Sequence, residues 1–169
     1  TARMACSRFI GLGHRRIALV HAADVFMIGH FAQQGYKAAL NAAGIEFDPR
    51  LCVEASMTEE GGVHVARALF DLPEPPTAIV CGQDLIALGV MRGIGETGRT
   101  VGTDVGVMGG DNHPFGSYVQ PALTTFSAET HRAGQRMAQM LLARLRGEGP
   151  EGLQEVWPQE LLVRTSDGP

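Results

Sequence analysis

Short apolar runs alternate with longer segments of helical periodicity along residues 1–108. The runs are rich in β-branched and small residues, which is typical of buried parallel strands, and lie at residues 17–20, 51–53, 78–81 and 105–108. The segments with helical spacing are closed by glycine or proline and lie at residues 2–12, 29–43, 58–72 and 84–97. This alternation predicts right-handed βαβ crossovers and therefore an α/β fold, a parallel sheet flanked by helices.

The pattern changes after Gly109. A turn-rich stretch at 110–116 leads to an extended segment at 123–126, and an amphipathic helix follows at 129–146. One face of that helix is apolar and comprises Ala133, Met137, Met140, Leu141 and Leu145. Two short extended segments, 155–157 and 161–164, close the chain. The last part of the chain therefore lies outside the repeating strand and helix units.

Composition bounds the class of protein. The chain has 169 residues, of which 44% are hydrophobic and 19% charged, as in one ordinary domain or a large part of a two-lobed one. The 14 Lys and Arg residues against 18 Asp and Glu give a net charge of -4. A protein that grips the phosphate backbone needs a basic surface, so these residues alone are predicted to bind DNA poorly.

The cysteines and the length of the apolar runs indicate the cellular compartment of the protein. Cys6, Cys52 and Cys81 are odd in number and lack C-x-x-C spacing, which favours reduced thiols and a cytoplasmic protein. No apolar run is long enough for a membrane span, and Thr1 to Gly13 lacks the apolar core of a signal peptide. We therefore expect a cytoplasmic protein without a membrane partner.

The motifs for nucleotides, metals and nucleophiles are incomplete. Gly11 to Arg16 begins like a dinucleotide fingerprint but precedes a strand, so Gly13 is interpreted as the end of a helix. The histidines have no zinc-ligand spacing, and we expect neither a metal nor a cofactor. Cys81 lies at a strand end, where a small core residue is favoured over a nucleophile.

The loops that follow the strands are the places to look for a ligand, because ligands bind beyond the carboxyl ends of parallel strands. These loops span residues 21–28, 55–57, 82–84 and 110–112. Asp111 can accept hydrogen bonds from ligand hydroxyls or form a turn, and both interpretations stay open. Asp84 begins a predicted helix and is interpreted as a structural first-turn carboxylate.

Six segments in order resemble the second half of a LacI/GalR-family transcriptional regulator, over nearly the whole chain. The resemblance rests on GHRRIA at 13–18, GYKAALNAAGI at 35–45, PTAIVCGQDLIALG at 76–89, DVGVMGGDN at 104–112, PALTT at 121–125 and ELLVRTS at 160–166. It implies a periplasmic-binding-protein-like fold of type I, of which this chain is mainly the C-terminal lobe. No reaction is implied, so the protein is not expected to be an enzyme.

The resemblance also implies a division of the chain. Residues 1–126 would form the C-terminal lobe, 127–152 a helix that crosses to the largely absent N-terminal lobe, and 153–169 the C-terminal strands. The resemblance also implies that the family's DNA-binding helix-turn-helix is absent from these residues. An amphipathic helix without its partner sheet is expected to expose an apolar stripe.

Residues at the family's effector-contact positions carry over with departures. Asp111 matches the family's effector-binding aspartate, Gln83 stands where an Asn is usual, and Met57 stands where an aromatic residue often stacks. Ala32 replaces a common effector-binding Arg and cannot form its forked hydrogen bonds. The predicted effector-binding residues are therefore Asp111, Gln83, Met57, Phe26, Ile28 and Ala32. This half of the site is less polar than a typical sugar site.

The resemblance implies a repressor that senses a small molecule, a sugar or related metabolite. The helix at 84–97 resembles the family's dimer-forming helix, so Leu85, Leu88 and Met91 are candidates for a homodimer interface, with core packing expected to claim at least one of them. Operator DNA would be bound only through the missing head. Two alternatives stay open: a periplasmic sugar-binding protein of a transporter, and an α/β enzyme that uses Asp111 with His113.

Overall fold

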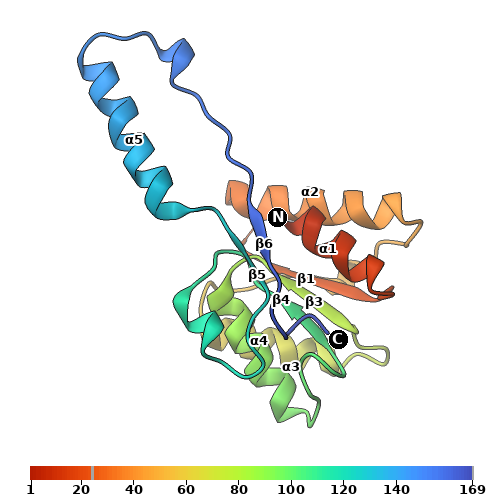
Figure 1. Cartoon of the computed structure of the whole chain (residues 1–169). Coiled ribbons are helices and arrows are strands. Elements are labelled where there is room, and N and C mark those ends of the chain that lie inside the picture. Colours follow the sequence, from red (N-terminus) through yellow and green to blue (C-terminus); the bar gives the residue numbers. More distant parts are fainter. Residues whose placement is uncertain (24, 169) are drawn as a thin grey trace.

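A parallel sheet forms the centre of the molecule. The computed structural model describes residues 1–23 and 25–168, and Figure 1 shows the arrangement of its elements. The sheet has the strand order β2-β1-β3-β4. Its strands are β1 (Ile17–His21), β2 (Cys52–Glu54), β3 (Ala78–Cys81) and β4 (Gly106–Met108). The predicted α/β fold with a parallel sheet is confirmed.

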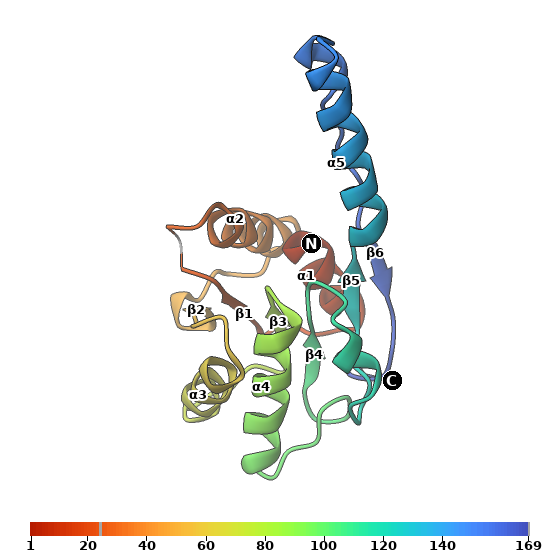
Figure 2. The same cartoon turned by 90° about the vertical axis from the view of Figure 1, so that its left-hand side faces the viewer.

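Helices cover both faces of this sheet (Figure 2). The helices α1 (Ala2–Gly11) and α2 (Met27–Ala42) pack on one face, and α3 (Glu59–Phe70) and α4 (Asp84–Glu96) pack on the other. Every residue of β1 and β3 is buried, because each strand has a neighbour on both sides and helices above and below. This burial explains why both strands are continuous apolar runs instead of alternating ones.

The ends of the helices follow local sequence signals. The Thr58 side chain accepts a hydrogen bond from the Gly61 amide at 3.0 Å, and Glu59 and Glu60 complement the positive end of α3. Gly13 follows the end of α1 with a φ of 96°, a conformation that favours glycine. The interpretation of Gly13 as a helix terminator is therefore confirmed, and the segment from Gly11 to Arg16 forms no phosphate loop.

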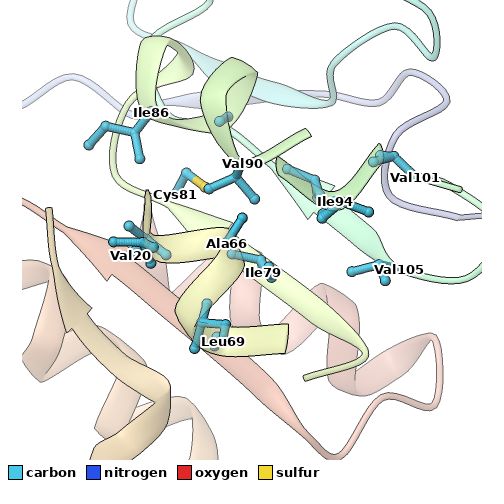
Figure 3. Packing of buried hydrophobic residues seen from close by; sticks show 14 of the residues in the cluster. Val20, Ala66, Leu69, Ile79, Cys81, Ile86, Val90, Ile94, Val101 and Val105 are labelled. Carbon is cyan, nitrogen blue, oxygen red and sulfur yellow. The ribbon is translucent and has the colours of Figure 1, made fainter. Parts of the chain in front are cut away.

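The larger core lies between the sheet and the helices α3 and α4 (Figure 3). Its side chains are mainly aliphatic and interdigitate as shown for Val20, Ala66, Leu69, Ile79, Cys81, Ile86, Val90, Ile94, Val101 and Val105. A second core lies between the sheet and α1 and α2, and it contains the larger aromatic side chains Phe9, Tyr36 and Phe126.

Glycines bring α3 and α4 into close contact. A Cβ atom at Gly89 would lie 1.9 Å from the Glu59 carbonyl oxygen, and one at Gly62 would lie 2.2 Å from the Ile86 carbonyl oxygen. Gly93 meets Ala66 in the same interface. Only residues without a side chain permit this separation of the two helix backbones, so the spacing of α3 and α4 is fixed by these positions.

A second, two-stranded sheet carries the chain away from the main body. Its antiparallel strands are β5 (Thr125–Ser127) and β6 (Glu160–Leu162), and between them the helix α5 (Thr130–Leu145) projects outward (Figure 1). No residue of α5 is buried. The apolar stripe expected on this helix is exposed, and Leu145 retains 75% of its side-chain surface.

The segment predicted as extended at 155–157 does not pair into a sheet. The structure forms no strand there, and β6 begins only at Glu160. Glu155 instead accepts a hydrogen bond from Arg136 of α5 at 2.7 Å, and the Arg132 guanidinium lies over the Trp157 ring. Short 3₁₀ turns that the sequence pattern did not indicate lie at Pro49–Leu51, Pro114–Ser117 and Pro150–Gly152.

The substitution Gly89→Ala tests the close helix contact. We expect it to lower the free energy of unfolding by about 1–3 kcal/mol, because the added methyl group overlaps the Glu59 carbonyl oxygen. Gly95→Ala is the matched control in the same helix, since nothing lies within 4 Å of its Cβ position. That control is expected to gain about 0.5–1 kcal/mol from helix propensity. Urea denaturation measures both, and equal stability of the two variants would contradict the close contact.

Candidate functional site

The strand order reverses between β1 and β3, which is where open α/β sheets bind ligands. A cavity of about 230 Å³ lies at the carboxyl ends of these two strands. It is lined by Thr1, Ala2, His21, Ala22, Ile28, Phe31, Ala32, Val80, Cys81, Gly82, Gln83, Gly110 and Gln159. A mainly apolar wall with a few polar groups is the usual composition of a small-molecule pocket.

Three of the predicted effector-binding residues lie together in this cavity. Ile28 and Ala32 are one helical turn apart on α2, and Gln83 is the residue that precedes α4. Phe31 joins them from α2 as a further lining residue, and it is 58% exposed. Sequence reasoning missed Phe31, although its spacing of three residues from Ile28 places both on one helix face.

Phe26 and Met57 lie in a neighbouring hollow. This second space of about 320 Å³ lies beside the end of β2, and among the described residues it shares only Ala22 with the first cavity. Five of the six predicted effector-binding residues are therefore divided between two adjacent hollows, and Asp111 lines neither of them. The predicted loop at 21–28 includes residue 24, which lies outside the described residues.

Asp111 lies beside the cavity, at the start of α4. Its Oδ1 atom accepts a hydrogen bond from the Asp84 amide at 2.9 Å, and the Asp111 amide approaches Asp84 Oδ1 at 3.3 Å. The carboxylate of each aspartate thus accepts a hydrogen bond from the backbone amide of the other. The neighbouring Gly110 lines the cavity, whereas the exposed Asp111 side chain does not. Asp111 therefore has a structural contact and an accessible carboxylate.

Asp84 is the fully buried partner in this pair. Its Oδ1 atom accepts from the Gly110 amide at 2.8 Å and the Thr125 hydroxyl at 2.5 Å, and its Oδ2 atom accepts from the His113 amide at 2.7 Å. These bonds compensate the carboxylate for its lost hydration. The interpretation of Asp84 as a structural first-turn carboxylate is confirmed, although Gln83 occupies the N-cap position.

The floor of the cavity requires a glycine. A Cβ atom at Gly110 would lie 2.3 Å from the Gly82 carbonyl oxygen, so the loops after β3 and β4 are in backbone contact. His21 forms part of the opposite wall at the end of β1 and is almost fully buried. Its Nδ1 atom bonds the Ala22 carbonyl oxygen at 2.6 Å, and its Nε2 atom lies 3.6 Å from Cys52 Sγ. These contacts fix the orientation of the ring.

The environment shifts the pKa of two acidic groups here. Partial burial raises the pKa of the Asp111 carboxyl, and the negative charge of Asp84 also raises it, against the lowering effect of the hydrogen bond from the Asp84 amide. Burial also raises the pKa of the Cys81 thiol, and Asp84 acts in the same direction. Cys81 is therefore a protonated core residue at neutral pH, as predicted, and not an activated nucleophile.

The Asp111 and His113 pair and the groups that could hold a metal ion were the remaining candidates for chemistry in the described part of the chain. His113 stacks on Phe115 with ring centroids 4.7 Å apart, and no hydrogen bond joins its ring to the Asp111 carboxylate within residues 1–23 and 25–168. Over the same residues no group of three His, Cys, Asp or Glu side chains could hold a metal ion. No described helix is long and apolar enough to cross a membrane.

The outer surface of α4 carries the predicted interface residues. Leu85 is 43% exposed, whereas Leu88 and Met91 are half-buried. Met91 also packs against the core between α4 and the sheet. Met91 thus contributes to the core as well as to the surface of α4. Leu85 is the most exposed of the three and the most available to a partner.

Comparisons with known proteins agree with this geometry. A family model described as a periplasmic binding protein-like domain matches residues 6–166. The chain is similar to the transcriptional regulator CelR of Thermobifida fusca, with 35% identity over 164 residues that cover 97% of this chain and 48% of that protein. The chain spans about half the length of the curated relatives it matches.

Solved structures give the same result. A LacI-family regulatory protein from Chloroflexus aggregans matches with a TM-score of 0.92 and 31% identity, covering 99% of this chain and 60% of that one. The complex of CelR with cellobiose matches with a TM-score of 0.90 and 35% identity, covering 98% of this chain and 50% of that one.

The parallel sheet and its flanking helices match the periplasmic-binding-protein-like fold of these regulators. The chain belongs to the periplasmic binding protein-like domain family, and the relatives named above are LacI-family transcriptional regulators. The resemblance stated from the sequence motifs is thereby confirmed. These relatives favour the regulator over the transporter-associated binding protein.

The raised pKa of Asp111 predicts a pH-dependent stability. Because the folded protein holds this proton more tightly than the unfolded chain, the contribution is full below the ordinary pKa of Asp and is lost as pH rises through the raised value. Asp111→Asn does not titrate and keeps an oxygen for the Asp84 amide. We expect its stability relative to the wild type to increase from about pH 4 to pH 7. Urea denaturation across this range measures the difference, and a constant difference would refute the shift.

Proposed function

We propose that this chain is the effector-sensing part of a LacI-family transcriptional repressor and that it binds a sugar or a related metabolite. The observation that carries the proposal is the cavity at the ends of β1 and β3, where Ile28, Ala32 and Gln83 meet. These are positions at which the family resemblance implies effector contacts. The similarity to CelR, which has been solved with cellobiose, supports a sugar as effector.

The cavity favours an uncharged effector. No Asp, Glu, Lys or Arg side chain lines it within the described residues. Ala32 supplies no guanidinium for a carboxylate or phosphate, and the first amide of α4 is already bonded to Asp111. Ile28 and Phe31 offer an apolar surface to the C–H face of a sugar ring, while the Gln83 amide and the Asp111 carboxylate offer hydrogen bonds to its hydroxyl groups.

Effector binding would control DNA binding through the relative orientation of two lobes. β5, α5 and β6 would connect this lobe to a first lobe, which would cover the cavity and the exposed stripe of α5. An effector held between the lobes stabilises one orientation, and a homodimer formed through α4 then presents its DNA-binding heads differently to an operator. Operator DNA would be contacted by the helix-turn-helix head and not by the residues of this chain.

Ligand-dependent thermal unfolding of the full-length protein tests the effector site. We expect at least one uncharged sugar from a panel that includes cellobiose to raise the melting temperature, because ligand binds only the folded state. Asp111→Asn is expected to reduce that rise while keeping the oxygen that bonds the Asp84 amide. Asp71→Asn, at the C-cap of α3 and outside the cavity lining, is the control and should retain the full rise.

Two results would count against this effector site. A panel in which sugars have no effect on melting temperature would contradict the sugar proposal. A sugar that stabilises the wild type and Asp111→Asn equally would exclude the Asp111 carboxylate from the binding site. A phosphorylated sugar or a dicarboxylate as the strongest stabiliser would contradict the assignment of an uncharged effector.

The substitution Leu85→Glu tests the proposed homodimer. Leu85 is 43% exposed and lies in the first turn of α4, where a carboxylate is compatible with the helix dipole, so the fold should tolerate the change. We expect the variant to be monomeric in sedimentation experiments at concentrations where the wild type is a dimer. Leu12→Glu, at a position of similar exposure after α1, should remain dimeric. Dimerisation of Leu85→Glu with wild-type affinity would remove α4 from the interface.

A further inference from the structure

The loop beside the cavity is held by both segments that connect the main body to α5. Asn112 follows Asp111 and has a φ of 50°, in the left-handed region. Its amide donates to the Thr125 hydroxyl oxygen at 3.2 Å, and its side-chain oxygen accepts from Arg164 Nη2 at 2.9 Å. Thr125 is the first residue of β5, and Arg164 lies two residues after β6.

The Thr125 hydroxyl is the central group of this arrangement. It is completely buried, accepts from the Asn112 amide and donates to Asp84 Oδ1 at 2.5 Å. The same Asp84 carboxylate holds the amides of Gly110 and His113, on either side of Asp111. One hydroxyl group therefore joins β5 to the loop that carries Asp111.

Arg164 makes the corresponding connection from the other segment. Besides bonding Asn112, its Nη1 atom donates to the Leu123 carbonyl oxygen at 2.6 Å, and its amide donates to Thr124 Oγ1 at 2.8 Å. Arg164 thus joins the segment after β6 to the segment before β5 and to the loop. We name Asp84, Asn112, Thr125 and Arg164 the loop clamp.

We infer that the loop clamp transmits effector occupancy from the Asp111 loop to β5 and β6, with Thr125 as the positioning residue at its centre. The inference rests on the proposed function, because it takes Asp111 as an effector contact. A displacement of Asp111 would move Asn112 next to it, and Asn112 is bonded to both connecting segments. Since the Asp84 carboxylate and the Thr125 hydroxyl are fully buried, breaking their bonds leaves polar groups without water, so the parts move together.

The substitution Thr125→Val separates transmission from binding. Valine keeps the shape of the side chain and removes its hydroxyl, while Thr125→Ser keeps the hydroxyl and removes the methyl group. Neither change alters a residue that lines the cavity. Ile94→Val, in the core at the far end of α4, is the control for a mild general loss of stability.

Hydrogen exchange of the full-length protein without sugar tests the contacts themselves. Thr125→Val is expected to speed exchange at the Asn112 amide by about tenfold, the factor that corresponds to one lost hydrogen bond. Thr125→Ser and Ile94→Val should leave this amide near its wild-type rate. An unchanged rate in Thr125→Val would overturn the clamp.

Exchange with a saturating sugar tests transmission, using cellobiose or the sugar of the panel that raises the melting temperature most. In the wild type and in Thr125→Ser, the sugar is expected to slow exchange in the loop at 110–113 and also in β5 and β6. In Thr125→Val the slowing should persist in the loop and vanish in the strands. The sugar-dependent change in operator affinity, typically about 5–150-fold for allosteric coupling, should fall toward unity in this variant alone.

The outcomes distinguish the two proposals. Slowing in β5 and β6 of Thr125→Val that equals the wild type would overturn transmission through the clamp and leave sugar binding intact. If the sugar does not slow hydrogen exchange anywhere in the wild type, the proposed function is overturned. The sugar-free experiment would still test the hydrogen bonds of the loop clamp. If Ile94→Val loses the sugar-dependent change in operator affinity to the same extent, the effect of Thr125→Val is a general loss of stability and not a loss of transmission.

Discussion

The rest of the structure depends on the buried carboxylate of Asp84. A charge removed from water must be compensated by hydrogen bonds, and here the donors are backbone amides after β4 and the Thr125 hydroxyl of β5. One side chain therefore fixes the start of α4, the floor of the cavity and the strand that leads to α5. Because the Asp84 carboxylate and the Thr125 hydroxyl are fully buried, separating them would leave both groups unpaired, so these parts form one mechanical unit.

Most helices and strands could be predicted from the sequence, because burial on both faces of a sheet and on one face of a helix leaves a local periodic signature. The strand order could not, since it depends on which elements pack together and not on local pattern. The reversal between β1 and β3, which places the cavity, is therefore a result of the structure alone. At residues 155–157 the local pattern predicts an extended segment, but the segment lies beside α5 and has no strand partner. Pairing into a sheet depends on a neighbouring strand, which a local pattern does not report.

The candidate site was predicted in part. Ile28, Ala32 and Gln83 were indicated by motif positions and do line one cavity. Gln159 was beyond prediction, since only the return of the chain through β6 brings it there. The reciprocal hydrogen bonds of Asp84 and Asp111 join residues 27 positions apart, and neither helix capping nor turn patterns in the sequence describe such a pair. The two interpretations of Asp111, a structural turn residue and an effector contact, are therefore not mutually exclusive.

The residues around the cavity differ in how well they accept substitutions, and this difference governs how such a site can evolve. Gly110, which lines the cavity, and Asp84, which accepts a hydrogen bond from the Gly110 amide, admit almost no replacement, because backbone contact and buried hydrogen bonds occupy the space around them. Ile28 and Phe31 on α2 instead retain more than half of their surface exposed, so replacements there remove little packing energy. New ligand preferences can therefore accumulate by single substitutions along this face of α2, while Gly110 and the hydrogen bonds of Asp84 stay unchanged.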